Sequence, residues 1–121
     1  METTRNGQAA VLLKKLGINP AHNGWKYLNE AINLAFEDER YLIGITKSMY
    51  PTIAKKFNVT TGSVERCIRY VIELSMTKAP IAALKAVFGN SIMDWSVSNS
   101  QFIATCVQVI KDEPNNPIWK M

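Results

Sequence analysis

The sequence predicts an all-α fold for this chain of 121 residues. Apolar residues recur with the three- and four-residue spacing of helices that bury one face, and no stretch shows the alternation typical of strands. Glycine is sparse, with six residues, and the five prolines fall at the edges of the apolar segments. Because an apolar content of 47% at this length is enough to build a core, one globular domain is expected.

Each predicted helix combines an apolar stripe with a residue that begins or ends it. Gly17 and Gly89 stand where two of the segments end, and glycine is common directly after a helix. Pro51 ends or kinks one segment and is well placed to begin the next. The helices are predicted over residues 8–16, 25–36, 42–49, 51–57, 61–77, 80–88 and 100–111.

These helices are expected to form one domain over residues 8–112. Residues 1–7 are predicted to be a flexible N-terminus, and residues 113–121 a flexible tail. Residues 90–99, which include Trp95, are predicted to form a loop.

The sequence gives no local sign of an enzyme or a metal protein. It has no cluster of His, Cys and carboxylate residues with metal-ligand spacing, no nucleophile elbow and no glycine-rich phosphate loop. Cys67 and Cys106 fall in apolar helical stretches and are predicted to be buried free thiols. His22, the single histidine, is predicted to be a turn residue. We therefore expect no catalysis, no metal and no cofactor.

The sequence also shows no membrane segment. No apolar run approaches the roughly 20 residues needed to span a bilayer, and the polar start lacks the apolar core of a signal peptide. A cytoplasmic protein without a membrane partner is expected.

Positive charge is concentrated in one part of the chain. The formal net charge is +4. Residues 47–78 contain six basic and two acidic side chains and hold the whole excess, while the rest of the chain is balanced. Such a basic segment is typical of a surface that binds a polyanion, although a solvated surface without a ligand would have the same composition.

The same segment has the residue pattern of a helix-turn-helix. Ala54 is small where the second helix must cross the first closely, and Asn58, four residues on, suits a left-handed turn. Thr60 or Thr61 is placed to cap the second helix. Apolar residues fall where the two helices must be locked together, at Ile53, Phe57, Val59, Val64 and Cys67. We therefore predict a helix-turn-helix centred on residues 51–77.

Helix 61–77 is predicted to bury one face and to turn a charged face outward. At about 100° per residue the buried face comprises Val64, Cys67, Ile68, Val71, Ile72 and Leu74, and the outward face comprises Gly62, Glu65, Arg66, Arg69 and Glu73. Arginine grips guanine with two hydrogen bonds, and glutamate accepts from the cytosine amino group. Glu65, Arg66 and Arg69 are therefore predicted to read bases in the major groove. The alternative at this point is an ordinary surface helix with Arg–Glu ion pairs.

Residues around this face are predicted to contact DNA phosphates, which fixes the register without reading sequence. They are Lys55, Lys56, Thr60 and Thr61, with Lys47 as a weaker candidate. Tyr70 lies beside the face and is predicted either to pack or to touch the DNA backbone.

Four stretches of the chain resemble one known family: Leu12–Leu28, Asn29–Phe36, Ile45–Val59 and Ser63–Glu73. The runs YPTIAKKFN and VERCIR within them are specific. On these residues the chain, over about residues 10–111, resembles the C-terminal effector domain of the sporulation initiation response regulator, stage zero sporulation protein A. The resemblance implies a six-helix bundle with a helix-turn-helix that regulates transcription at entry into sporulation.

The resemblance also implies partners and site residues. Family domains bind duplex DNA at short boxes of the TGTCGAA type, often as a tandem pair, and engage the sigma subunit of RNA polymerase; a homodimer or tandem pair on DNA is therefore implied here. By position, Glu65 and Arg66 correspond to the Glu and Arg of the family's V-E-R run, and Arg69 corresponds to the next Arg. Ser63 stands where the family has a base-reading arginine, and Tyr70 where it has histidine, so the box sequence does not carry over unchanged.

Two functions follow from these observations. The first is a sequence-specific transcription regulator. The second is a protein-interaction module that binds the RNA polymerase sigma factor, or the full-length regulator, without reading DNA, and Ser63 in place of arginine favours it. The family's full-length protein begins with a receiver domain, which this chain lacks. We therefore expect either an excised domain or a stand-alone version that phosphorylation cannot switch.

Overall fold

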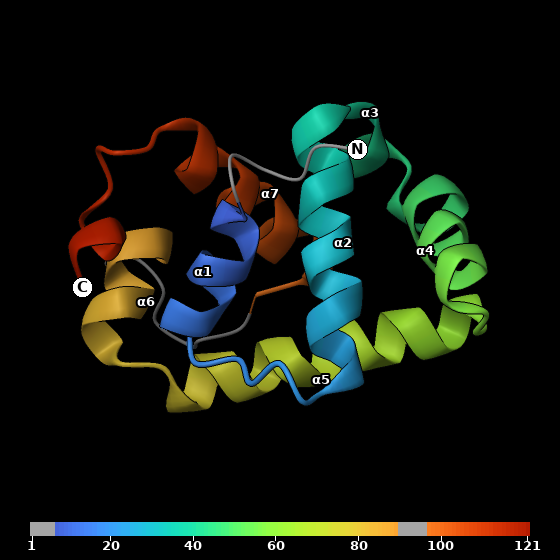
Figure 1. Ribbon diagram of the computed structural model, residues 1–121, viewed down its shortest axis with the longest axis horizontal. Coiled ribbons are helices and arrows are strands. Elements are labelled where there is room, and N and C mark those ends of the chain that lie inside the picture. The colour runs from blue at the N-terminus through green and yellow to red at the C-terminus, as the bar shows by residue number, and fades with distance from the viewer. Residues whose placement is uncertain (1–6, 90–96) are drawn as a thin grey trace.

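The computed structural model describes residues 7–89 and 97–121, and every regular element within them is helical (Figure 1). The elements follow in the order α1 (Gln8–Lys15), α2 (Asn23–Glu37), α3 (Arg40–Ile43), the π-helical turn η1 (Ile45–Met49), α4 (Tyr50–Phe57), α5 (Thr61–Lys78), α6 (Ile81–Phe88), α7 (Asn99–Lys111) and the 3₁₀ helix η2 (Pro117–Lys120). The predicted all-α class is confirmed. The described residues form seven α-helices, as many as the ranges predicted from the sequence and one more than the resemblance implied.

The segment predicted as one helix over residues 42–49 forms two elements. α3 ends at Ile43, and the backbone then widens into η1, where the N–H groups of both Ser48 and Met49 donate to the carbonyl oxygen of Gly44, at 2.7 and 3.2 Å. α4 begins directly after this turn with Pro51 in its first turn, where the missing N–H costs no helical hydrogen bond. The proline therefore starts a helix without interrupting one.

α2 is the central helix of the fold. In Figure 1 it stands between α1 and α4 with one end on α5, and it also packs against α7. Apolar residues recur at helical spacing along its inward face. Small and large side chains among them together fill the space between the neighbouring helices. The buried residues of this face include Tyr27, Leu28, Ala31, Ile32 and Ala35.

α5 is fixed to the rest of the molecule at two points. At Gly24 of α2, a Cβ atom would lie 2.2 Å from the carbonyl oxygen of Cys67 and 2.8 Å from Cγ1 of Val71, so only glycine leaves room for the backbone of α5. Nearer the C-terminal end of α5, the buried hydroxyl of Ser75 donates to the carbonyl oxygen of Leu16, at 2.6 Å. α2 and the end of α1 therefore set the position of α5.

The chain after α7 differs from the flexible tail predicted for residues 113–121. It turns back into η2, where Ile118 is fully buried, and the side-chain amide of Asn116 donates to the carbonyl oxygen of Ala86, at 2.8 Å. One buried residue in so short a segment produces no periodic pattern, so this packing could not be predicted from the sequence. Residues 1–6 and Trp95 lie outside the described residues.

Candidate nucleic-acid interface

α4 and α5 form a helix-turn-helix whose turn has the predicted chemistry. Asn58 adopts the left-handed conformation, with φ 57° and ψ 50°, directly after α4. The hydroxyl oxygen of Thr60 then accepts a hydrogen bond from the backbone N–H of Ser63, at 3.0 Å, and caps α5. Of the two cap candidates, Thr60 therefore forms the cap.

The apolar contacts between the two helices largely follow the prediction. Ile53, Ala54 and Val64 are buried, as are the α5 residues Ile68, Val71 and Ile72. Cys67 and Leu74 are only half-buried, because they lie at the edge of the inward face. Both cysteines are free thiols, and burial raises the pKa of the Cys106 thiol well above its usual range. The prediction of a buried Cys67 is therefore wrong, and that of a buried Cys106 is confirmed.

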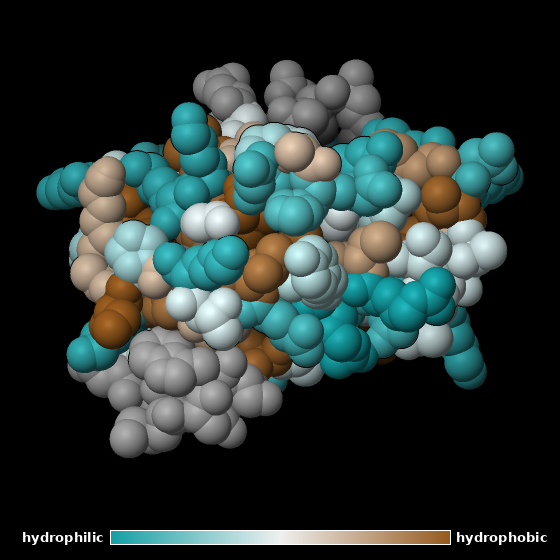
Figure 2. Space-filling model, turned by 90° about the horizontal axis from the view of Figure 1, so that it is seen from below, coloured by the Kyte–Doolittle hydropathy of each residue, from teal (hydrophilic) through white to brown (hydrophobic). Residues whose placement is uncertain are grey.

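The outward face of α5 carries the residues predicted to read bases. Arg66, Arg69 and Glu73 are exposed, and Ser63 and Glu65 are half-buried. Figure 2, which views the molecule from the α5 side, shows a largely hydrophilic surface with apolar patches between the polar side chains. The side chains of Arg66, Arg69 and Glu73 are therefore accessible to solvent, and that of Glu65 is partly accessible.

Arg66 extends over Gly62 towards the start of α5. Its Nη1 atom lies 3.1 Å from the position that a Cβ atom would take at Gly62. This direction follows from the tilt of helical side chains towards the N-terminus. Among the described residues Arg66 has no ion-pair partner, so its guanidinium group is accessible to a ligand.

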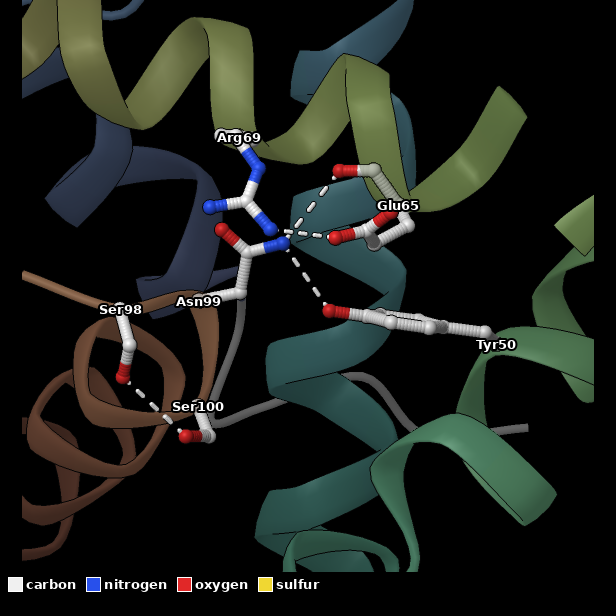
Figure 3. Close-up of polar contacts among 6 residues, drawn as sticks. All are labelled: Tyr50, Glu65, Arg69, Ser98, Asn99 and Ser100. Carbon is white, nitrogen blue, oxygen red and sulfur yellow. Dashed lines mark hydrogen bonds and ion pairs between the residues drawn. The ribbon is translucent and has the colours of Figure 1, made fainter. Parts of the chain in front are cut away.

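Glu65 and Arg69 form an ion pair with each other, one helical turn apart (Figure 3). The Arg69 side chain is 55% exposed and that of Glu65 is 38% exposed. The Glu65 carboxylate raises the pKa of Arg69 by hydrogen bonding and by charge. The sequence predicts that Glu65 and Arg69 each contact a base, but here the two side chains are paired with each other. The alternative interpretation, an ordinary surface helix with Arg–Glu ion pairs, predicts this pairing.

Cationic side chains lie on the elements next to α5. Lys47 of η1 and Lys55 and Lys56 of α4 are exposed. The ammonium group of Lys56 is bound by the carboxylate of Glu30 on α2, at 2.8 Å. Glu30 was not predicted to belong to the site, because its contact joins residues far apart in the sequence. Any anion that binds Lys56 competes with this carboxylate.

The remaining predicted phosphate contacts lie around the start and the side of α5. Thr60 and Thr61 are exposed, and the Thr60 hydroxyl hydrogen is still available to a ligand after capping. Tyr70 is 53% exposed, with its ring edge against His22 at a centroid distance of 5.7 Å. Tyr70 therefore packs on one side and is accessible on the other.

A groove of about 500 Å³ runs between α5 and the start of α7, and Asn99 lies in it. The Asn99 side-chain amide donates to the Tyr50 hydroxyl at 3.0 Å and to the backbone carbonyl oxygen of Glu65 at 3.3 Å (Figure 3). Asn99 was not among the residues predicted from the sequence. The one available signal was the capping box of Ser98 and Gln101, which fixes the start of α7 but not the direction of Asn99.

The described ranges contain no group of three or more His, Cys, Asp or Glu residues arranged to hold a metal ion. None of the helices in these ranges is both long and apolar enough to cross a bilayer.

Comparison with protein families gives one match that covers most of the chain. The model of the family described as "Sporulation initiation factor Spo0A C terminal" matches residues 9–110. This range contains α4, α5 and all ten predicted site residues.

Proposed function

The chain belongs to the family of Spo0A C-terminal domains, which are DNA-binding domains of sporulation regulators and not enzymes, and on this premise we propose that it reads duplex DNA with α5 in the major groove. The observation that carries the proposal is the accessible outward face of α5, with Arg66 and Arg69 exposed on it. A recognition helix in a helix-turn-helix reads base edges with the N-terminal part of this face.

The proposal divides the site into base readers and phosphate contacts. Arg66 has an accessible fork of donors for the acceptor atoms of guanine. Glu65 and Arg69 act as a pair, in which the carboxylate accepts from a cytosine amino group while the arginine donates to a neighbouring guanine. Ser63 offers a short hydroxyl to the first base. The phosphate contacts are Lys47, Lys55, Lys56, Thr60, Thr61 and Tyr70.

The test begins with selection of bound duplexes from a random DNA pool. The affinity of the selected duplex is then measured over a series of salt concentrations. Neutralising several phosphates gives a linear decrease of log K with log salt, with a slope steeper than about −2. Binding by two copies on adjacent boxes would appear as a second, slower band in a gel shift.

Two results would contradict the proposed DNA binding. If no duplex is selected and none binds at low salt, while the protein retains purified sigma factor or full-length regulator in a pull-down, the domain is an interaction module. A flat salt slope likewise contradicts the proposed phosphate contacts.

The substitution Glu30→Gln is expected to strengthen binding to every duplex. It removes the carboxylate that binds the ammonium group of Lys56 at 2.8 Å. Lys56 can then bind a DNA phosphate without first losing an ion pair. Because exposed ion pairs are worth about 0.2–1 kcal/mol, the gain should be at most about fivefold at moderate salt. Titration of the selected and an unrelated duplex measures the effect.

Glu37→Gln is the matched control for this substitution. It makes the same change of charge at the C-terminal end of α2, where Glu37 is exposed. Equal gains from both variants would show that net charge, and not release of Lys56, determines the effect.

A further inference from the structure

Asn99 joins three helices at one point beside the outward face of α5 (Figure 3). It is the first residue of α7, and its side-chain amide donates both to Tyr50, the first residue of α4, and to the backbone of Glu65 on α5. Asn99 is 7% exposed and Tyr50 is 5% exposed. A single buried amide group therefore links the two helices of the helix-turn-helix to each other.

The position of this link matters for recognition. Its contact on α5 is the backbone of Glu65, the residue whose carboxylate holds Arg69. A movement of α5 relative to α4 would break one of the two hydrogen bonds of Asn99 and leave a buried polar group unpaired, which is costly. The link therefore favours one position of the Glu65–Arg69 pair relative to the cations of α4.

The other half of the Asn99 side chain is unused. Its amide oxygen is buried and has no hydrogen-bond partner among the described residues. Asn99 and Arg69 line the same groove, and in Figure 3 the amide oxygen points towards the side on which Arg69 leaves α5. The oxygen is an acceptor, and a guanidinium group has five donors, so Arg69 has donors to spare for it.

We propose that Asn99 is a positioning residue for base recognition. Its amide N–H groups fix Glu65 and Arg69 relative to α4, and its amide oxygen accepts a hydrogen bond from Arg69 when the Glu65 carboxylate turns to a base. Asn99 itself contacts no base. This inference rests on the proposed reading of DNA by α5 and adds a buried residue on α7 to its specificity.

The test compares Asn99→Ala with Ser75→Ala. Both remove a hydrogen bond that holds α5, but Ser75 holds the C-terminal half of this helix, through Leu16, and contacts neither Glu65 nor Arg69. For each variant, affinity is measured on the selected duplex and on duplexes with single base changes, at a temperature where circular dichroism shows both variants folded. The salt slope is measured in parallel.

Asn99→Ala is expected to reduce discrimination between the selected and changed duplexes by about three- to tenfold, part of the value of a good base contact. The salt slope should stay unchanged, because no phosphate contact is lost. Ser75→Ala should leave the discrimination unchanged even though it lowers stability. Asn99→Leu, which is similar in size and removes both the donors and the acceptor, should resemble Asn99→Ala, and serves if the alanine variant does not fold.

Two failures can be told apart. If the wild-type protein discriminates but Asn99→Ala loses no more discrimination than Ser75→Ala, the role of Asn99 is overturned and the proposed function stands. If the wild-type protein does not discriminate between duplexes, the proposed function itself fails and the inference falls with it.

Discussion

Replacing Arg66 with alanine is expected to abolish the preference for one base pair in the selected duplex. Its guanidinium group is accessible and lies over Gly62, near the start of α5, where a recognition helix enters the groove. A two-pronged contact with guanine supplies about 1–3 kcal/mol of discrimination, or roughly 5- to 150-fold in affinity. Titration of duplexes changed at each position in turn would locate the base pair that Arg66 reads.

Lys55→Ala is the control for this prediction. Lys55 is exposed on α4 and has no ion-pair partner among the described residues. Its loss should weaken binding to all duplexes alike and make the salt slope shallower by about one unit. If Arg66→Ala shows this same uniform loss, Arg66 is a phosphate contact and the assignment of the base readers is wrong.

The substitution Gly24→Ala is expected to cause the largest loss of stability, about 3 kcal/mol in the free energy of unfolding. The added Cβ would lie 2.2 Å from a backbone carbonyl oxygen of α5, and this oxygen cannot rotate away as a side chain would. This clash is relieved only if α2 and α5 move apart, and that movement loosens the packing of the core around both helices. Urea denaturation followed by circular dichroism measures the change.

Gly44→Ala is the comparison for Gly24→Ala. The nearest atom to a Cβ at this position is Cβ of Ser48 at 3.5 Å, an ordinary contact, and the φ angle of −113° suits any residue. The substitution should change stability by less than about 1 kcal/mol. Comparable losses from both variants would mean that the close crossing of α2 and α5 is not the cause.

The helices and the turn could be predicted from the sequence because their determinants are local. Apolar spacing placed the inward face of α5, and the conformational preference of Asn58 placed the turn. The outward direction of Arg66 and Arg69 followed from the same periodicity. The exposure of Arg66 and Arg69 was thus predicted from the sequence, while the contacts of Glu30 and Asn99 with the predicted site residues were not.

The features that the sequence did not reveal depend on contacts between distant segments. The bond of Glu30 to Lys56, the link made by Asn99 and the packing of Ile118 each join residues from separate elements. No local pattern marks such pairs. The wider turn at η1 was also missed, because its sequence has the same apolar spacing as an ordinary helix.

The guanidinium group of Arg66 occupies the space that a side chain at position 62 would need. Glycine lowers helix stability relative to alanine. At position 62 it also leaves space for the side chain of Arg66. Any larger residue there would meet a flexible guanidinium group and would redirect it without disturbing the core. A substitution at position 62 would then alter the base contact proposed for Arg66 without a change at Arg66 itself.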